Sequence, residues 1–124
     1  KKETIDKIIF TIAYLITTII TGIIFLLYPT KITRPLIANT GIYHETIRFF
    51  YNIIPTYNLF PSFHMSLLVL STLFIRKENK NIGNILVAFT IIIAITTLFL
   101  KEHYIIDLIA GFILSITIYK ILVK

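Results

Sequence analysis

The sequence predicts an all-α protein, a bundle of transmembrane helices in a single domain over residues 1–124. The first observation is composition: 56% of the residues are hydrophobic and the mean hydropathy is +0.87, well above soluble domains. The second is a series of uncharged apolar runs near bilayer length. The third is that the cations stand at the edges of these runs, a distribution that argues against a nucleic-acid partner. The absence of cysteine excludes disulfides and thiolate metal sites.

Four segments are expected to cross the membrane. A helix rises about 1.5 Å per residue, so about 20 apolar residues span the hydrocarbon core. Residues 8–28 and 81–100 reach this length without a charged side chain. Residues 62–75 are shorter and residues 103–122 carry a carboxylate, which spans tolerate where their polar ends open into a wet pocket. The first run is too long for a signal-peptide core, so we expect it to remain as a membrane helix.

The long connection, residues 29–61, is expected to contain a further helix of a different kind. In its middle part, GIYHETIRFFYNII, the apolar side chains of Tyr43, Ile47, Phe50 and Ile54 share one face at helical spacing. Polar side chains lie toward another face. This amphipathic pattern predicts a helix that lies in the membrane interface. The alternative is a covered loop helix that packs on the bundle.

The distribution of cations predicts the orientation. With four spans, both termini and the turn at 76–80 share one side of the membrane. That side holds eight of the twelve cations: Lys1, Lys2, Lys7, Arg76, Lys77, Lys80, Lys120 and Lys124. The other side holds Lys31, Arg34, Arg48 and Lys101. Because cytoplasmic segments carry the excess of Lys and Arg, the termini are expected to be cytoplasmic and the long loop extracytoplasmic.

Three polar clusters fall on the predicted outer side, each at a helix boundary: YPTKITRP at 28–35, NLFPSFH at 58–64 and KEHYIID at 101–107. In the third cluster, His103 and Asp107 are four residues apart, so they share a face of a helix. A carboxylate so placed orients an imidazole and stabilises its charged form, as in a directed nucleophile or base. The alternative is a pair that merely satisfies itself inside the bundle.

The other two clusters predict an anion site. Pro61 suits the first turn of a helix, whose free N–H groups and positive dipole end favour an anion. Ser62 can add a hydroxyl donor, and His64 can donate a proton. Arg34 and Lys31 supply cations for phosphate oxygens, although each cluster alone also fits an ordinary helix end. Together the three clusters predict phosphoryl transfer without a metal or another cofactor.

These motifs resemble the type 2 phosphatidic acid phosphatase (PAP2) superfamily. Its pattern is a Lys…Arg-Pro motif, a Pro-Ser-x-His motif and a Ser-Arg-x5-His-x3-Asp motif. The stretch PSFH matches the second motif in full, HYIID matches the latter half of the third, and RP at 34–35 ends the first. The phrases NLFPSFH and TTLFLKEHYIIDLIAG look most like the inositol phosphorylceramide synthase and sphingomyelin synthase-like branch. The resemblance covers about residues 20–120 and implies the PAP2/acid phosphatase-like helical core.

The resemblance also implies a membrane lipid phosphatase or phosphotransferase that acts on a lipid phosphate or phospholipid head group. By position, His103 would attack the phosphorus and become a phosphohistidine, with Asp107 orienting it. His64 would protonate the leaving alcohol and then activate water or an acceptor hydroxyl. Arg34 and Ser62 would bind phosphate oxygens.

The chain departs from the family pattern at two places. The Ser-Arg of the third motif falls on Thr96 and Thr97, so one phosphate-binding arginine is absent. Lys101, one helical turn after Thr97, is a candidate replacement. The lysine of the first motif would fall on Leu27, whereas the lysine present is Lys31. The family usually has six spans, so four spans here indicate missing N-terminal spans or a minimal form that associates as a homo-oligomer.

Two other functions stay open on the sequence alone. A membrane electron carrier could bind haem through His64 and His103, although the Pro-Ser and Arg-Pro elements would then be unused. A catalytically inactive PAP2-like membrane module would account for the absent arginine.

Overall fold

The computed structural model describes residues 1–29, 31, 33–34, 36–37, 39–53, 60–100 and 103–123. The regular elements of this part of the chain are five helices: α1 (Lys2–Leu27), α2 (Ile42–Ile53), α3 (Phe63–Glu78), α4 (Lys80–Phe99) and α5 (Ile105–Leu122). The predicted all-α fold class is confirmed. Each segment that was expected to be helical contains one of these helices.

Three of the described helices, α1, α4 and α5, are long and apolar enough to cross a membrane. This finding is consistent with an integral membrane protein. The helix in the remaining expected span, α3, has 16 residues. Its length is about 24 Å at 1.5 Å per residue, against a hydrocarbon core of about 30 Å. The four-span count therefore stays a prediction, and it depends on α3.

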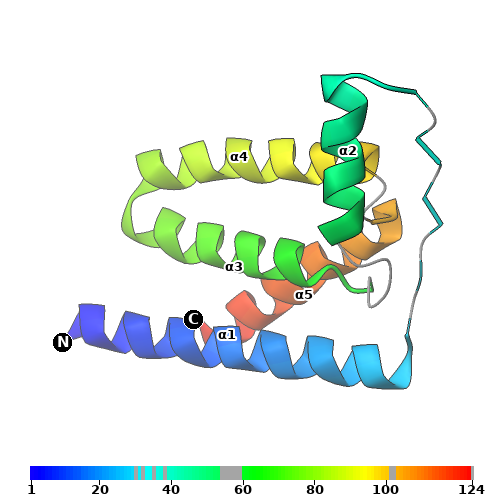
Figure 1. Cartoon of the computed structure of the whole chain (residues 1–124). Coiled ribbons are helices and arrows are strands. Elements are labelled where there is room, and N and C mark those ends of the chain that lie inside the picture. The colour runs from blue at the N-terminus through cyan, green and yellow to red at the C-terminus, as the bar shows by residue number, and fades with distance from the viewer. Residues whose placement is uncertain are drawn as a thin grey trace.

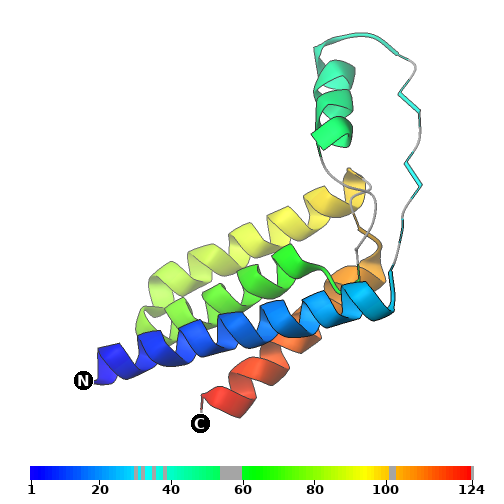
Figure 2. The ribbon, with the colours of Figure 1, turned by 60° about the horizontal axis from the view of Figure 1, so that its bottom comes forward.

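The short helix α3 is the centre of the bundle, in contact with α1, α4 and α5 (Figures 1 and 2). Two apolar clusters form the core, one of Ala13, Leu70, Phe74 and Ile118 and one of Met65, Val69 and Leu108. The Phe74 ring lies edge-on to Phe10 and to Tyr119, with 5.2 Å between centroids in each pair. Aromatic rings prefer this geometry because positive ring edges meet negative ring faces. The core thus joins α3 to α1 and α5.

A tight turn joins α3 to α4. Asn79 ends α3 and caps α4, where its Oδ1 accepts the backbone N–H groups of Asn81 and Ile82, both at 3.1 Å. Asparagine is among the preferred N-cap residues because its side chain satisfies these donors. A Cβ at Gly83 would lie 2.4 Å from Cα of Arg76, so the two helices approach closely from the first turn of α4.

The helices run so that their ends gather into two groups. Both termini and the α3–α4 turn lie at one end of the bundle (Figures 1 and 2). The C-terminal end of α1 and the N-terminal ends of α3 and α5 lie at the other end. The described parts of the three polar clusters therefore share one end of the molecule. Which face of a membrane each end meets stays a prediction.

The amphipathic helix α2 stands away from the bundle (Figure 2), and none of its residues is buried. Arg48 ties α2 to the preceding chain, since its guanidinium donates to the carbonyls of Ile37, at 2.8 Å, and Asn39 and pairs with Glu45. The alternative in which this helix is covered by packing on the bundle is therefore wrong. An open apolar face is what an interfacial helix requires, and its place in an interface stays a prediction.

Candidate active site

The turn that begins α5 is built on the carboxylate of Asp107. Its Oδ2 accepts the backbone N–H of Tyr104 at 2.8 Å. A carboxylate in the first turn of a helix is also stabilised by the positive end of the helix dipole. Asp107 is only 2% exposed, so this hydrogen bond provides a partner for a charge that burial would otherwise disfavour.

The imidazole of His103 lies between Asp107 and Ser62. Its Nδ1 is 3.4 Å from Oδ2 of Asp107, and its Nε2 is 3.5 Å from Oγ of Ser62. The His103 side chain is 11% exposed, so it is reachable from outside while most of it is enclosed. A proton on Nδ1 faces the carboxylate, and the lone pair on Nε2 is then directed toward Ser62. In the tautomer that carries its proton on Nδ1, the ring is oriented as an acceptor or nucleophile at Nε2.

Ser62 joins the start of α3 to the start of α5. Its Oγ accepts the backbone N–H of Met65 at 3.2 Å, and its own N–H donates to the backbone carbonyl of Asp107 at 3.0 Å. Ser62 is therefore the N-cap, and α3 begins at Phe63. The expectation that Pro61 lies in the first turn of the helix is wrong, because the Ser62 hydroxyl caps the helix by accepting the Met65 N–H, which fixes the boundary after Ser62.

A cleft of about 730 Å³ lies between the end of α1 and the start of α5 and meets this site at Asp107, while His103 and Ser62 are not among the residues that line it. It is lined by Ile24, Tyr28, Pro29, Lys31, Phe60, Tyr104, Ile106 and Asp107. The volume is typical of small-ligand sites, which combine apolar walls with a few polar groups. Here the charged lining residues are Lys31 and Asp107. An amphiphilic molecule with an anionic head would match this lining.

The residues that meet at this end come from separate motifs along the chain. Residues 8–121 match the family model described as the PAP2 superfamily. The chain belongs to the PAP2 superfamily. Searches among curated proteins and among solved structures found no match. The resemblance is therefore confirmed at the level of the superfamily, and a membrane phosphatase-type function is consistent with it. The synthase-like branch stays a prediction.

The histidine of the Pro-Ser-x-His motif, His64, is placed differently from His103 of the third motif. His64 is exposed on the first turn of α3, two residues after Ser62. Its ring lies edge-on to that of Phe63, with 6.2 Å between centroids. The structure thus brings Ser62, His103 and Asp107 into one contact group, whereas His64 is exposed on the first turn of α3 and has no described contact with that group.

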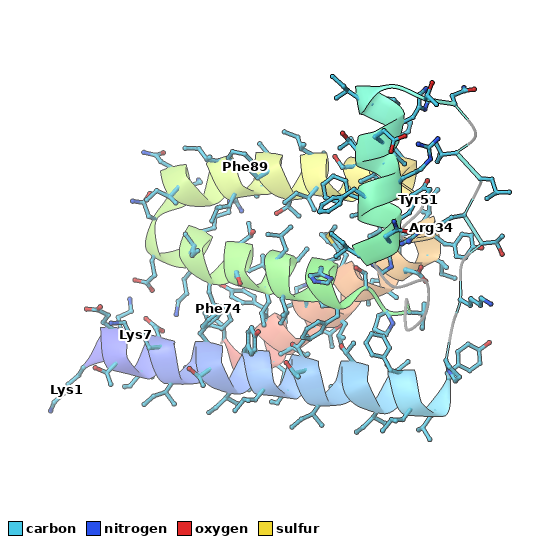
Figure 3. All side chains as sticks on the ribbon, in the orientation of Figure 1. Lys1, Lys7, Arg34, Tyr51, Phe74 and Phe89 are labelled. Atoms are coloured by element: carbon cyan, nitrogen blue, oxygen red, sulfur yellow. The ribbon has the colours of Figure 1, made fainter. Side chains whose placement is uncertain are left out.

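The cations expected to bind phosphate also lie in different places. Lys31 lines the same cleft as Asp107. Arg34 is held beside α2, with its guanidinium 4.9 Å from the centre of the Tyr51 ring and 3.1 Å from the Tyr51 carbonyl oxygen (Figure 3). Lys101, the candidate replacement for the missing arginine, lies outside the described residues. Of the two described cations, Lys31 is the one placed at the cleft.

The two threonines at the Ser-Arg positions of the third PAP2 motif are used by their own helix. The hydroxyl of Thr96 donates to the Ile92 carbonyl, and that of Thr97 donates to the Ala94 carbonyl, both at 2.8 Å. These local hydrogen bonds satisfy the two hydroxyl groups within α4. Neither threonine supplies a positive charge to the site.

Three aromatic residues of the cleft were not predicted from the sequence: Tyr28, Phe60 and Tyr104. A signal was available, because each belongs to one of the three polar clusters. Among the described residues, no group of three or more His, Asp or Glu side chains gathers as a metal site.

The N-cap at Ser62 gives a stability prediction. Ser62→Ala removes the acceptor for the Met65 N–H and should lower the free energy of unfolding by about 1 kcal/mol. Ser62→Gly should cost only a few tenths of a kcal/mol, because glycine is tolerated at an N-cap. Thermal or denaturant unfolding in detergent measures both, with Ser71→Ala on the same helix as the control. An Ala variant as stable as the Gly variant would show that the hydroxyl does not cap α3.

Proposed function

We propose that this PAP2 protein is an integral membrane phosphatase or phosphotransferase that acts on a lipid phosphate or a phospholipid head group. The reaction proceeds through a phosphohistidine at His103 and requires no metal. The observation that supports this most strongly is the imidazole of His103, oriented by the Asp107 carboxylate at Nδ1 and directed at Ser62 through Nε2. By the distribution of cations, this end of the bundle faces the extracytoplasmic side.

In the first step, Nε2 of His103 attacks the phosphorus of a substrate in the cleft. The N–P bond forms as the P–O bond to the leaving alcohol breaks. The imidazole becomes positively charged, and the Asp107 carboxylate, 3.4 Å from Nδ1, stabilises that charge. His64 donates a proton to the leaving oxygen, which avoids the release of a free alkoxide.

In the second step, His64 accepts a proton from the incoming hydroxyl group. The oxygen attacks the phosphorus, the N–P bond breaks, and His103 returns to its starting state. With water as the acceptor and a phosphate monoester as the substrate, the products are an alcohol and inorganic phosphate. With a lipid or sugar alcohol as the acceptor, the phosphoryl group is transferred. Two successive displacements at phosphorus, with one histidine as nucleophile and then as leaving group, are typical of covalent catalysis.

Three features of the site support binding of the phosphate. The first turn of α3 offers backbone N–H groups and a positive dipole end. Ser62 offers its hydroxyl next to Nε2 of His103. Lys31, in the cleft with Asp107, is assigned the cationic role that the PAP2 pattern gives to the arginine missing at Thr97. A lysine binds phosphate as a point charge and does not need the fixed planar fork of an arginine.

The same contacts weigh against the haem alternative. An iron ligand at His103 would use Nε2, which lies 3.5 Å from Oγ of Ser62, and would need space for a porphyrin at that point. The Ser62 N–H is bonded to Asp107, which fixes α3 close to α5 there. The arrangement supports a compact phosphate better than a porphyrin.

The direct test is an assay of the purified chain with a panel of lipid phosphates in the presence of EDTA. Free phosphate or new phospholipid should form, and His103→Ala should lower the rate by on the order of 10³-fold or more, since the nucleophile is removed. His44→Ala, on α2, is the matched histidine control and should retain the activity. Turnover that survives His103→Ala would contradict the mechanism. An inactive wild-type chain would favour the inactive module.

The assignment of Lys31 gives a second test. Lys31→Ala should lower kcat/KM by about 10- to 100-fold, the equivalent of a hydrogen bond to a charged group. Arg34→Ala should cause a smaller loss because its guanidinium is held at Tyr51. Lys31→Arg should restore most of the activity, and Lys7→Ala at the other end of the bundle is the control. A larger loss from Arg34→Ala than from Lys31→Ala would overturn the assignment.

A further inference from the structure

Directly below the site, α3 and α5 approach each other more closely than side chains normally allow. The absence of a side chain at Gly111 of α5 allows this approach. A Cβ there would lie 2.7 Å from the backbone oxygen of Ser62 and 3.0 Å from Oγ of Ser66. Real Cβ atoms do not tolerate the first of these distances. A glycine is unfavourable inside a helix, so its presence here has a packing reason. The atom that it accommodates belongs to Ser62, the residue that faces His103.

Buried serine hydroxyls hold the same crossing. Oγ of Ser66 donates to the Ser62 carbonyl at 2.7 Å. The single hydroxyl proton of Ser115 is shared between two acceptors, the Ser66 carbonyl across the interface and the Gly111 carbonyl within α5, the latter at 3.0 Å. Ser66 and Ser115 are fully buried. The spacing is four residues on both helices, which places these groups along the facing sides.

The two halves of the candidate site stand on these two helices. Ser62 belongs to the start of α3, while His103 and Asp107 belong to the start of α5. The separation of Nε2 from Oγ of Ser62 therefore depends on how far α3 slides or rotates relative to α5. Two contacts fix the position of α3 relative to α5. One is the hydrogen bond from the Ser62 N–H to the Asp107 carbonyl, and the other is the close crossing at Gly111.

We infer that Gly111, Ser66 and Ser115 form a positioning clasp that sets the alignment of His103 with the phosphate held at Ser62. The clasp acts through Ser62 and touches no substrate, so its members are positioning residues. The inference rests on the proposed function for its kinetic consequence. A misplacement of about 1 Å at a reacting centre can cost on the order of 10²-fold in rate.

The test compares three glycines in the purified full chain. Gly111→Ala crowds the clasp and should lower kcat by about 10- to 100-fold, with KM changed by less than about 3-fold because the cleft is intact. Gly83→Ala crowds α3 against α4 at the other end of the bundle and should lower stability while kcat is retained. Gly22→Ala meets nothing within 4 Å, so kcat should be retained and stability should not fall, since alanine is favoured over glycine inside a helix.

A second measurement keeps the clasp testable apart from the enzymatic activity. The NMR signals of isotope-labelled His103 in detergent should shift in Gly111→Ala and not in Gly83→Ala, whether or not the chain turns over a substrate. If Gly111→Ala does not fold, Ser115→Ala provides the same comparison, with Thr90→Ala as a half-buried hydroxyl control between α3 and α4.

The outcomes separate the clasp from the proposed function. Wild-type kcat and wild-type His103 signals in Gly111→Ala and Ser115→Ala would overturn the clasp. An equal loss of kcat in Gly83→Ala would also overturn it, because the loss in Gly111→Ala would then be explained by general destabilisation of the bundle. A wild-type chain without activity, together with shifted His103 signals in Gly111→Ala, would uphold the clasp while the proposed function fails.

Discussion

The hydrogen bonds of Asp107 are the constraint on which the rest of the site depends. Its carboxylate accepts the Tyr104 N–H and so begins α5, the same Oδ2 faces Nδ1 of His103, and its backbone carbonyl accepts the Ser62 N–H. A buried carboxylate without partners would be costly in an apolar bundle. Because these partners all come from the starts of α3 and α5, satisfying one charge also assembles the candidate nucleophile and the anion-binding helix start.

The packing of the bundle explains why this charge can be kept. Helix α3 is short and central, with α1, α4 and α5 around it, so its N-cap residue Ser62 is enclosed at 1% exposure. The outer helices keep most of their apolar side chains outside the bundle, as lipid-facing helices do, and the only buried residue of α4 is Gly83. Close packing of helices at small residues therefore contributes here to the stability that a large apolar core provides in soluble proteins. The same close approach, at Gly111, fixes the site.

What could be predicted from the sequence was local. The apolar runs located the membrane-length helices. The spacing of His103 and Asp107 indicated that the two side chains meet, although they do not share a helix face, because α5 begins at Ile105 and His103 precedes its N-cap, Tyr104. Features that depend on distant contacts could not be predicted. Arg34 is one example, because an aromatic ring of α2 holds it, and Gly111 is another, because only the crossing of α3 gives it a role. The helix boundary at Ser62 was missed since a cap decides it, not the preceding proline.

The central claim is that His103 is the nucleophile, and trapping the covalent intermediate tests it most directly. The purified chain is incubated briefly with a lipid phosphate labelled with ³²P, denatured in alkali, and mapped by mass spectrometry. A phosphoramidate is stable to alkali and labile to acid, which distinguishes it from a phosphoserine ester. The account predicts an acid-labile label on His103 that builds up within a turnover and is absent from His103→Ala. Turnover without any label, or a label on another residue, would contradict it.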